Sequence, residues 1–218
     1  VSDWDFSKIG VERQASRMFK LSNKFIKKGN HVVADFICPT PKTRKIFNPN
    51  FIVWVDTIKK GRFEKMNKMF IKPKKYNVRV DSKQSDIWAF KIADKIVKYK
   101  WDNKKSTAQM LGRWQPWHEG HQELFYEIIK KEGQVYIMVK DVHGIGDNPF
   151  SYKIIKKRIN KKLKDFKNRF KIVLAPNITN ICYGRTVGYN FEKINLPKSI
   201  QQISGTKIRK QLRMKGKI

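Results

Sequence analysis

The residues best suited to chemistry lie in one segment, Gly112-Arg113-Trp114-Gln115-Pro116-Trp117-His118-Glu119-Gly120-His121. An apolar stretch precedes it and a helical pattern follows it, and this is where open α/β sheets bind phosphates. Gly120 removes a Cβ where a polyphosphate must approach the backbone. His118 and His121 are three apart in the first helical turn, so both imidazoles can point at one anion and stabilise charge that develops in a transition state. We therefore expect both histidines to be catalytic.

Two simpler interpretations of the histidine pair stay open. The side chains could be a helix cap and a satisfied surface group. A metal site is disfavoured because no third ligand is nearby and because two histidine ligands on one helix are ordinarily four apart. We expect no metal ligand among these residues.

A second segment with anion-binding character, Ile203-Ser204-Gly205-Thr206-Lys207-Ile208-Arg209, opens the last predicted helix. Ser204 is a favourable N-cap, and Gly205 leaves amides exposed. Thr206 and Arg209 share a face at the positive end of the helix dipole. The segment predicts a second anion clamp, and the alternative is an ordinary capped helix with an exposed arginine.

Both segments resemble one family. GRWQPWHEGH resembles the GRFQPFHxGH signature of the HxGH nucleotidyltransferase superfamily, and ISGTKIR resembles its C-terminal ISxTxIR element. DNPFSYKIIKKRI is similar to the ENPF segment of the nicotinamide-mononucleotide adenylyltransferase branch. The resemblance implies that a substrate phosphate attacks the α-phosphate of ATP or CTP, that pyrophosphate leaves, and that Mg²⁺ is bound largely through the phosphates. The small phosphorylated acceptor is not identified by any of these residues.

The same resemblance implies individual roles. His118 and His121 would contact the triphosphate, while Ser204, Thr206 and Arg209 would hold its β and γ groups. The remaining expected nucleotide-binding residues are Gly112, Arg113, Trp114 and Gly120. Tryptophan stands at 114 and 117, where the family more often has phenylalanine, and this could narrow the pocket.

The N-terminal half resembles a different family. FSKIGVERQASRM, HVVADFICPTPKTR and FIVWVDT are similar to the elements that follow the phosphate-binding loop of adenylylsulfate kinases. The resemblance implies that adenylylsulfate binds to Arg13, Arg17, Phe36 and Ile37. Ser16 and Cys38 depart from the family pattern, and a generic buried parallel sheet is the alternative. No GxxxxGK[ST] occurs in the 218 residues, so we expect no kinase activity from this chain.

The formal charge of +31 raises the possibility of a nucleic-acid partner. The 38 Lys and 11 Arg residues are spread through every segment instead of forming a stripe, which favours a compositional origin and makes a nucleic-acid partner improbable. Three functions follow in order: a nucleotidyltransferase, expected to transfer an adenylyl group, fused to a kinase-like domain; a sulfate-activation protein whose complete form phosphorylates adenylylsulfate; and a basic nucleic-acid-binding protein on a nucleotidyltransferase scaffold.

The elements that must position these residues alternate between strand and helix, which predicts parallel sheets. Helices are expected over 11–28, 85–97, 119–131, 151–164 and from about 204, and strands over 31–38, 51–57, 108–111, 134–141 and 170–176. Residues 39–45 should be a loop, and 58–80 a basic loop or lid. We expect an α/β protein of two small parallel-sheet domains: a truncated P-loop kinase-like unit over 1–98, a linker over 99–106, and a Rossmann-like HxGH nucleotidyltransferase domain over 107–218.

Several broad classes are disfavoured. No apolar run approaches the ~18 residues needed to cross a bilayer, and no secretory signal is visible, so a cytoplasmic protein without a membrane partner is expected. Cys38 and Cys182 have no zinc or disulfide spacing and are expected to be buried thiols. The chain begins at Val1 without an initiator methionine, which suggests a fragment. The oligomeric state is not fixed by the sequence.

Overall fold

The structure is a computed structural model, and it describes residues 5–59, 61–81, 84–185, 188 and 190–218. The fold is α/β with two small parallel sheets, of two and three strands. The chain divides into two compact units, Val1–Trp88 and Ala89–Ile218. This division lies within helix α4 (Ser85–Val97), earlier than the linker expected over 99–106. Most of α4 belongs to the second unit because its Asp94 forms a buried ion pair with Arg169 at 2.6 Å.

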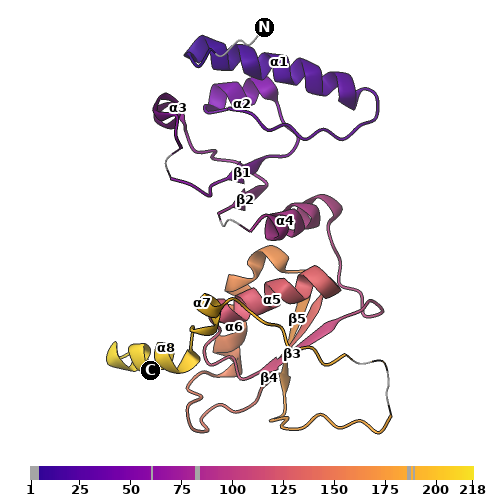
Figure 1. The fold of residues 1–218 in the computed structure, drawn as a ribbon, viewed down its shortest axis with the longest axis vertical. Helices are drawn as coiled ribbons and strands as arrows, with labels where there is room; N and C mark the ends of the chain where they lie inside the picture. Colours follow the sequence, from indigo (N-terminus) through magenta and orange to yellow (C-terminus); the bar gives the residue numbers. More distant parts are fainter. Residues whose placement is uncertain (1–4, 60, 82–83, 186–187, 189) are drawn as a thin grey trace. The chain divides into compact units, whose positions relative to one another are not determined.

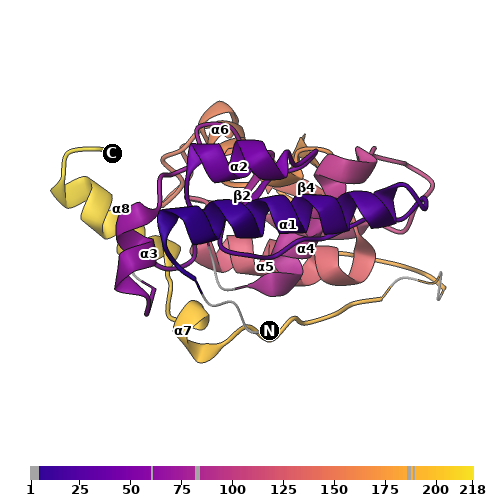
Figure 2. The same ribbon diagram turned by 90° about the horizontal axis from the view of Figure 1, so that it is seen from above.

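The first unit is built on two helices and a short parallel sheet. Its elements are α1 (Lys8–Ile26), α2 (Pro41–Phe47), β1 (Val53–Val55), α3 (Glu64–Met69) and β2 (Val78–Val80). Helices α1 and α2 lie side by side in both views (Figures 1 and 2). Strand β1 pairs with β2, so that Val53 lies opposite Val78 and Val55 opposite Val80.

Three sequence predictions for this unit are wrong. Residues 31–38 form no strand, and Val33 is 97% exposed, because β1 takes β2 as its neighbour and leaves that apolar run without a ladder. The expected loop at 39–45 contains α2, which begins with Pro41 at its first turn and has Thr40 as its N-cap. Residues 58–80 contain α3 and β2, and are not a continuous loop.

The second unit follows the predicted alternation closely. Its elements are β3 (Ala108–Gly112), α5 (Glu119–Glu132), β4 (Val135–Lys140), α6 (Tyr152–Lys162), a 3-10 turn η1 (Lys164–Phe166), β5 (Phe170–Ala175), α7 (Lys198–Gln201) and α8 (Gly205–Met214). The three strands are parallel in the order β3-β4-β5. The helices and strands expected from residue 108 onward are confirmed, and α7 is an addition to them.

The core of this unit lies where helices meet the central strand. Val135, Ile137 and Val139 alternate inward along β4 and are at most 1% exposed, as expected for a strand covered on its faces. Helix α5 packs against β3, β4 and α7, and its Phe125 and Ile129 are fully buried. The N-terminus of α5 is therefore held near the carboxyl end of β3.

Two further expectations concern the surface. Cys182 is exposed, so the prediction that both thiols are buried is wrong for it, while Cys38 is half-buried. None of the helices in the described part of the chain is both long and apolar enough to cross a bilayer.

Candidate functional site

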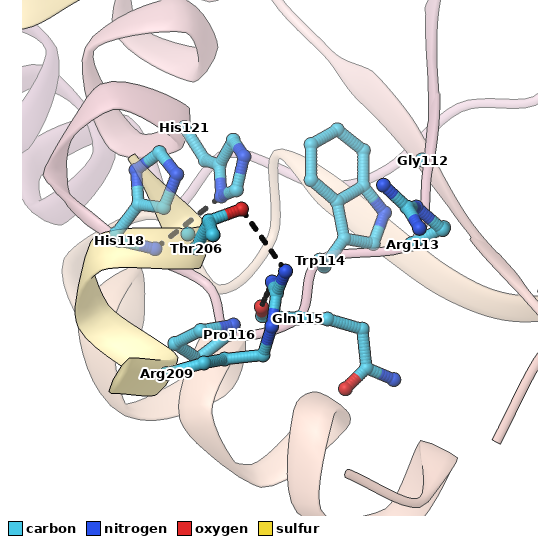
Figure 3. A pocket seen from close by; sticks show the side chains of 10 residues that line it. Gly112, Arg113, Trp114, Gln115, Pro116, His118, His121, Thr206 and Arg209 are labelled. Atoms are coloured by element: carbon cyan, nitrogen blue, oxygen red, sulfur yellow. Dashed lines mark hydrogen bonds between the residues drawn. The ribbon is translucent and has the colours of Figure 1, made fainter. Parts of the chain in front are cut away.

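A pocket of about 230 Å³ opens in the second unit, where β3 gives way to α5 and α8 begins. Figure 3 shows His118, His121 and Thr206 on one side and Trp114 and Arg113 on the other, with Arg209 reaching between them. Ten residues line it: Gly112, Arg113, Trp114, Gln115, Pro116, His118, His121, Gly205, Thr206 and Arg209. The two segments singled out in the sequence, more than 80 residues apart, thus share one pocket.

One wall of the pocket is made by Trp114, which folds back over the end of β3. Its backbone has φ of 53°, and its indole Nε1 donates to the Met138 carbonyl at 2.9 Å. A Cβ on Gly112 would lie only 2.8 Å from the indole ring, so glycine is required there for the ring to pack. The role of Gly112 is therefore to admit the Trp114 side chain.

Gln115 ties the pocket loop to the segment that follows β4. Its side-chain amide donates to the Phe150 carbonyl at 2.8 Å, and its Oε1 accepts from the Phe150 N–H at 2.9 Å. Its backbone carbonyl accepts from Arg209 Nη1 at 2.6 Å. Gln115 is 5% exposed. It positions the loop and has its hydrogen-bonding groups occupied by the protein.

The two histidines lie against each other at the start of α5. Their rings stack with centroids 3.6 Å apart. The backbone N–H of His118 donates to Nδ1 of His121 at 3.3 Å. This bond makes Nδ1 an acceptor, so a neutral His121 carries its proton on Nε2 and can only donate from there. Nδ1 of His118 is buried and has no hydrogen-bond partner among the described residues.

The electrostatics keep both imidazoles neutral. Burial, and then the charge of His118, lower the pKa of His121 from 6.5 to about 3. Burial also lowers the pKa of His118. Trp114 and Trp117, with centroids 4.8 and 5.5 Å from the His121 ring, supply much of the apolar surroundings. The histidines are therefore uncharged donors near neutral pH, and the positive charge of the lining comes from Arg113 and Arg209.

Gly120 makes room for the side chain of His118. A Cβ at this position would lie 3.1 Å from Cε1 of His118, so the missing side chain makes room for the imidazole. Gly120 is buried and does not line the pocket. The packing of His118 accounts for a glycine at this position, and the close approach of a phosphate to it stays a prediction.

The start of α8 contributes the other side of the pocket. Arg209 is 6% exposed, and its Nη2 donates to the hydroxyl of Thr206 at 3.1 Å. Gly205 lets the guanidinium approach, because a Cβ there would be 3.3 Å from both Nη1 of Arg209 and the Gln115 carbonyl. Ser204 occupies the N-cap position, but its side chain makes no capping hydrogen bond and it does not line the pocket.

Two residues next to the pocket, Asp147 and Arg213, are not among the residues that the sequence predicts for the site. Asp147 accepts from Nη2 of Arg209 at 3.3 Å and from Nη2 of Arg213 at 2.7 Å. Hydrogen bonds from Arg213 and Arg209 hold the pKa of the Asp147 carboxyl below its ordinary value. Nothing local in the sequence links Asp147 to α8, because 62 residues separate it from Arg209.

The four residues predicted to hold adenylylsulfate lie in the first unit. Arg13 pairs with Asp5 at 3.1 Å, and Arg17 donates to Gln14. Phe36 packs edge-on against Phe47 with centroids 4.9 Å apart, and Ile37 is 38% exposed. None of these four residues lines the pocket described above.

Comparisons with known protein families, with curated proteins and with solved structures find no match. In the described part of the chain, no three His, Cys, Asp or Glu side chains gather closely enough to hold a metal ion. What the site offers chemically is a small pocket of hydrogen-bond donors and fixed positive charge.

Proposed function

We propose that the second unit is a nucleotidyltransferase. It would transfer a nucleotidyl group, most simply adenylyl, from a nucleoside triphosphate to a phosphate-bearing acceptor. An acceptor oxygen forms a bond to the α-phosphorus, the bond from that phosphorus to the bridging oxygen of the β-phosphate breaks, and pyrophosphate leaves with the electron pair.

One observation carries the proposal: two groups in the pocket that could act as either donor or acceptor, those of His121 and Thr206, each accept a hydrogen bond from within the protein. His121 accepts from the His118 backbone at Nδ1, and the Thr206 hydroxyl accepts from Arg209. His121 can then only donate, from Nε2–H, and Thr206 keeps its hydroxyl hydrogen to donate. A pocket that offers donors and two arginines suits an anion with many oxygens, and a triphosphate is such an anion.

The helices around the pocket add to this preference. The pocket lies beside the N-termini of α5, of 14 residues, and α8, of 10 residues. Both helix ends place partial positive charge and unpaired N–H groups there. No carboxylate is among the described residues that line the pocket.

The chain's own residues divide the work between chemistry and binding. His121 is a neutral donor that needs no change of charge, and it would stabilise the oxygens of the α-phosphate as the transition state forms. Arg209 and Thr206 would hold the terminal phosphates, whose charge persists throughout. Magnesium, when bound, would neutralise phosphate charge, and its ligands would be phosphate oxygens because no cluster of three ligating side chains occurs in the described residues.

The test measures pyrophosphate release from ATP or CTP with Mg²⁺, against nicotinamide mononucleotide, simple phosphomonoesters and sulfate. Release with sulfate would favour a sulfate-activation role over transfer to a phosphate. His121→Ala should lower kcat by about 10² to 10³ with little change in KM, as for loss of one preorganised donor. His31→Ala, which removes an exposed histidine of the first unit, is the control. Absence of release from every pair, or unchanged kcat in His121→Ala, contradicts the proposal.

A second candidate, binding of nucleic acid, is favoured by the charge of α6. This helix contains six basic residues and no acidic one, whereas α5 contains four glutamates and two lysines. Lys153, Lys157 and Lys161 are all exposed on α6. If this face binds a phosphate backbone, duplex DNA affinity should fall steeply with salt, and replacing the three lysines by Gln should flatten the slope by about 2 to 3. Such binding in a protein that releases no pyrophosphate would favour this candidate.

A further inference from the structure

Arg213 is placed to extend the phosphate site, although it does not line the pocket. Arg209 and Arg213 are four residues apart on α8, and therefore on one face of the helix. The carboxylate of Asp147 bridges them, with one oxygen 3.3 Å from Nη2 of Arg209 and the other 2.7 Å from Nη2 of Arg213. Two guanidinium groups that share one two-oxygen anion form a site for an anion of that shape.

We propose that Arg213 is a further triphosphate-binding residue, and that Asp147 occupies its site and that of Arg209 until the terminal phosphate of the nucleotide displaces it. The inference rests on the proposed function, because it assigns a place to the terminal phosphate of the same substrate. Asp147 then acts as an internal counter-ion that competes with the ligand.

The burial of the three groups supports displacement. The Arg209 side chain is 7% exposed, while those of Asp147 and Arg213 are 48% and 52% exposed. Arg209 is also held by Gln115 and Thr206, so it keeps its position without Asp147. Asp147 and Arg213 can rotate into solvent at small cost, because exposed ion pairs contribute little to stability.

The charges favour replacement of the Asp147 carboxylate by the terminal phosphate. In the structure one carboxylate faces two guanidinium groups, and this leaves one positive charge of the three groups uncompensated. A terminal phosphate carries more negative charge and more acceptor oxygens than a carboxylate, so it makes the stronger bridge to two arginines. Repulsion between that phosphate and Asp147 then favours rotation of the carboxylate away from the helix.

The test compares binding of ATP, AMP and inorganic tripolyphosphate to the wild-type chain and to four variants of it. Arg213→Gln should weaken the binding of ATP and tripolyphosphate by roughly 5- to 10-fold, as for loss of an exposed charge-assisted contact. It should leave the affinity for AMP unchanged. Asp147→Asn should strengthen the binding of ATP and tripolyphosphate, because it removes the competing charge. Lys210→Gln removes one charge from an exposed position of the same helix and is the control. Arg213→Lys, which keeps the charge without the planar fork, should weaken ATP by an intermediate factor.

Any of the following results would overturn the inference. Arg213→Gln could bind ATP as tightly as Lys210→Gln does, or it could lose affinity for AMP as much as for ATP. Either result would show that Arg213 does not bind the terminal phosphate. Asp147→Asn could weaken ATP, which would make the carboxylate a support for the arginines instead of a competitor. Failure of the wild-type chain to bind ATP and tripolyphosphate would overturn the proposed function together with this inference. Wild-type binding that Arg213→Gln leaves intact would overturn the inference alone.

Discussion

Lowering the pH from 7 to 5 should destabilise the second unit through His121. The pKa of this imidazole is lowered from 6.5 to about 3 in the folded protein, first by burial and then by His118. Below pH 6.5 the unfolded chain binds a proton that the folded chain refuses until about pH 3, so stability falls as the pH drops through that window. Each pH unit within it corresponds to about 1.4 kcal/mol. At pH 5, about 1.5 units below 6.5, the expected loss is about 2 kcal/mol, and it depends little on the exact folded pKa.

The assay is urea unfolding at pH 7 and pH 5, followed by tryptophan fluorescence, in the wild type and in His121→Asn. Trp114 and Trp117 lie beside the His121 ring, so their emission reports this unit. Carboxylates and His118 contribute to the pH dependence of both forms, and the difference between the two isolates His121. His31→Asn is the control for a histidine exposed to solvent. An equal pH dependence in wild type and His121→Asn would refute the assignment of His121 as a buried neutral donor.

The remaining predictions concern packing and ion pairs. Gly112→Ala should cost about 1 to 3 kcal/mol of stability, measured by chemical unfolding, because its Cβ would meet the Trp114 ring at 2.8 Å; an unchanged stability would show that the indole is free to move. Arg169→Met should cost about 3 to 5 kcal/mol, since it leaves the buried carboxylate of Asp94 unpaired, and Asp94→Ala in the same chain should restore part of the loss. Thr40→Ala should cost about 1 kcal/mol by removing the cap of α2, and this loss should appear only in the unfolding of the first unit.

The sequence predicts the second unit well because the signals there are local. The apolar run over β4 is bounded by polar residues, and the helix α5 ends at Gly133, which adopts the left-handed conformation with φ of 75°. The two segments of the pocket were predicted separately from their cap and glycine patterns. That they meet in one pocket depends on contacts between distant elements: Arg209 of α8 donates to the Gln115 carbonyl, and α5 packs against α7.

The parts that could not be predicted depend on contacts between distant residues. Gln115 pairs with Phe150, 35 residues away, and this bond orders the pocket loop without any mark in the local sequence. In the first unit the apolar run at 31–38 has strand composition, yet a strand forms only where a neighbour completes its ladder, and β2 takes that position beside β1. Composition alone does not say which of several short runs will pair.

The two tryptophans that depart from the expected motif bear on the chemistry of the histidine. Trp114 and Trp117 are 7% and 5% exposed, and both rings contact His121. Large apolar rings exclude water, and loss of water disfavours the imidazolium form. A charged His121 would attract the triphosphate equally in the ground state and in the transition state, and uniform attraction does not accelerate the chemical step. In the proposed reaction, a neutral donor fixed at Nε2 would form its strongest hydrogen bond only as charge accumulates on the α-phosphate oxygens. Under the proposed function, the indoles would thus favour a role for His121 in the transition state, and ground-state attraction would come from Arg113 and Arg209.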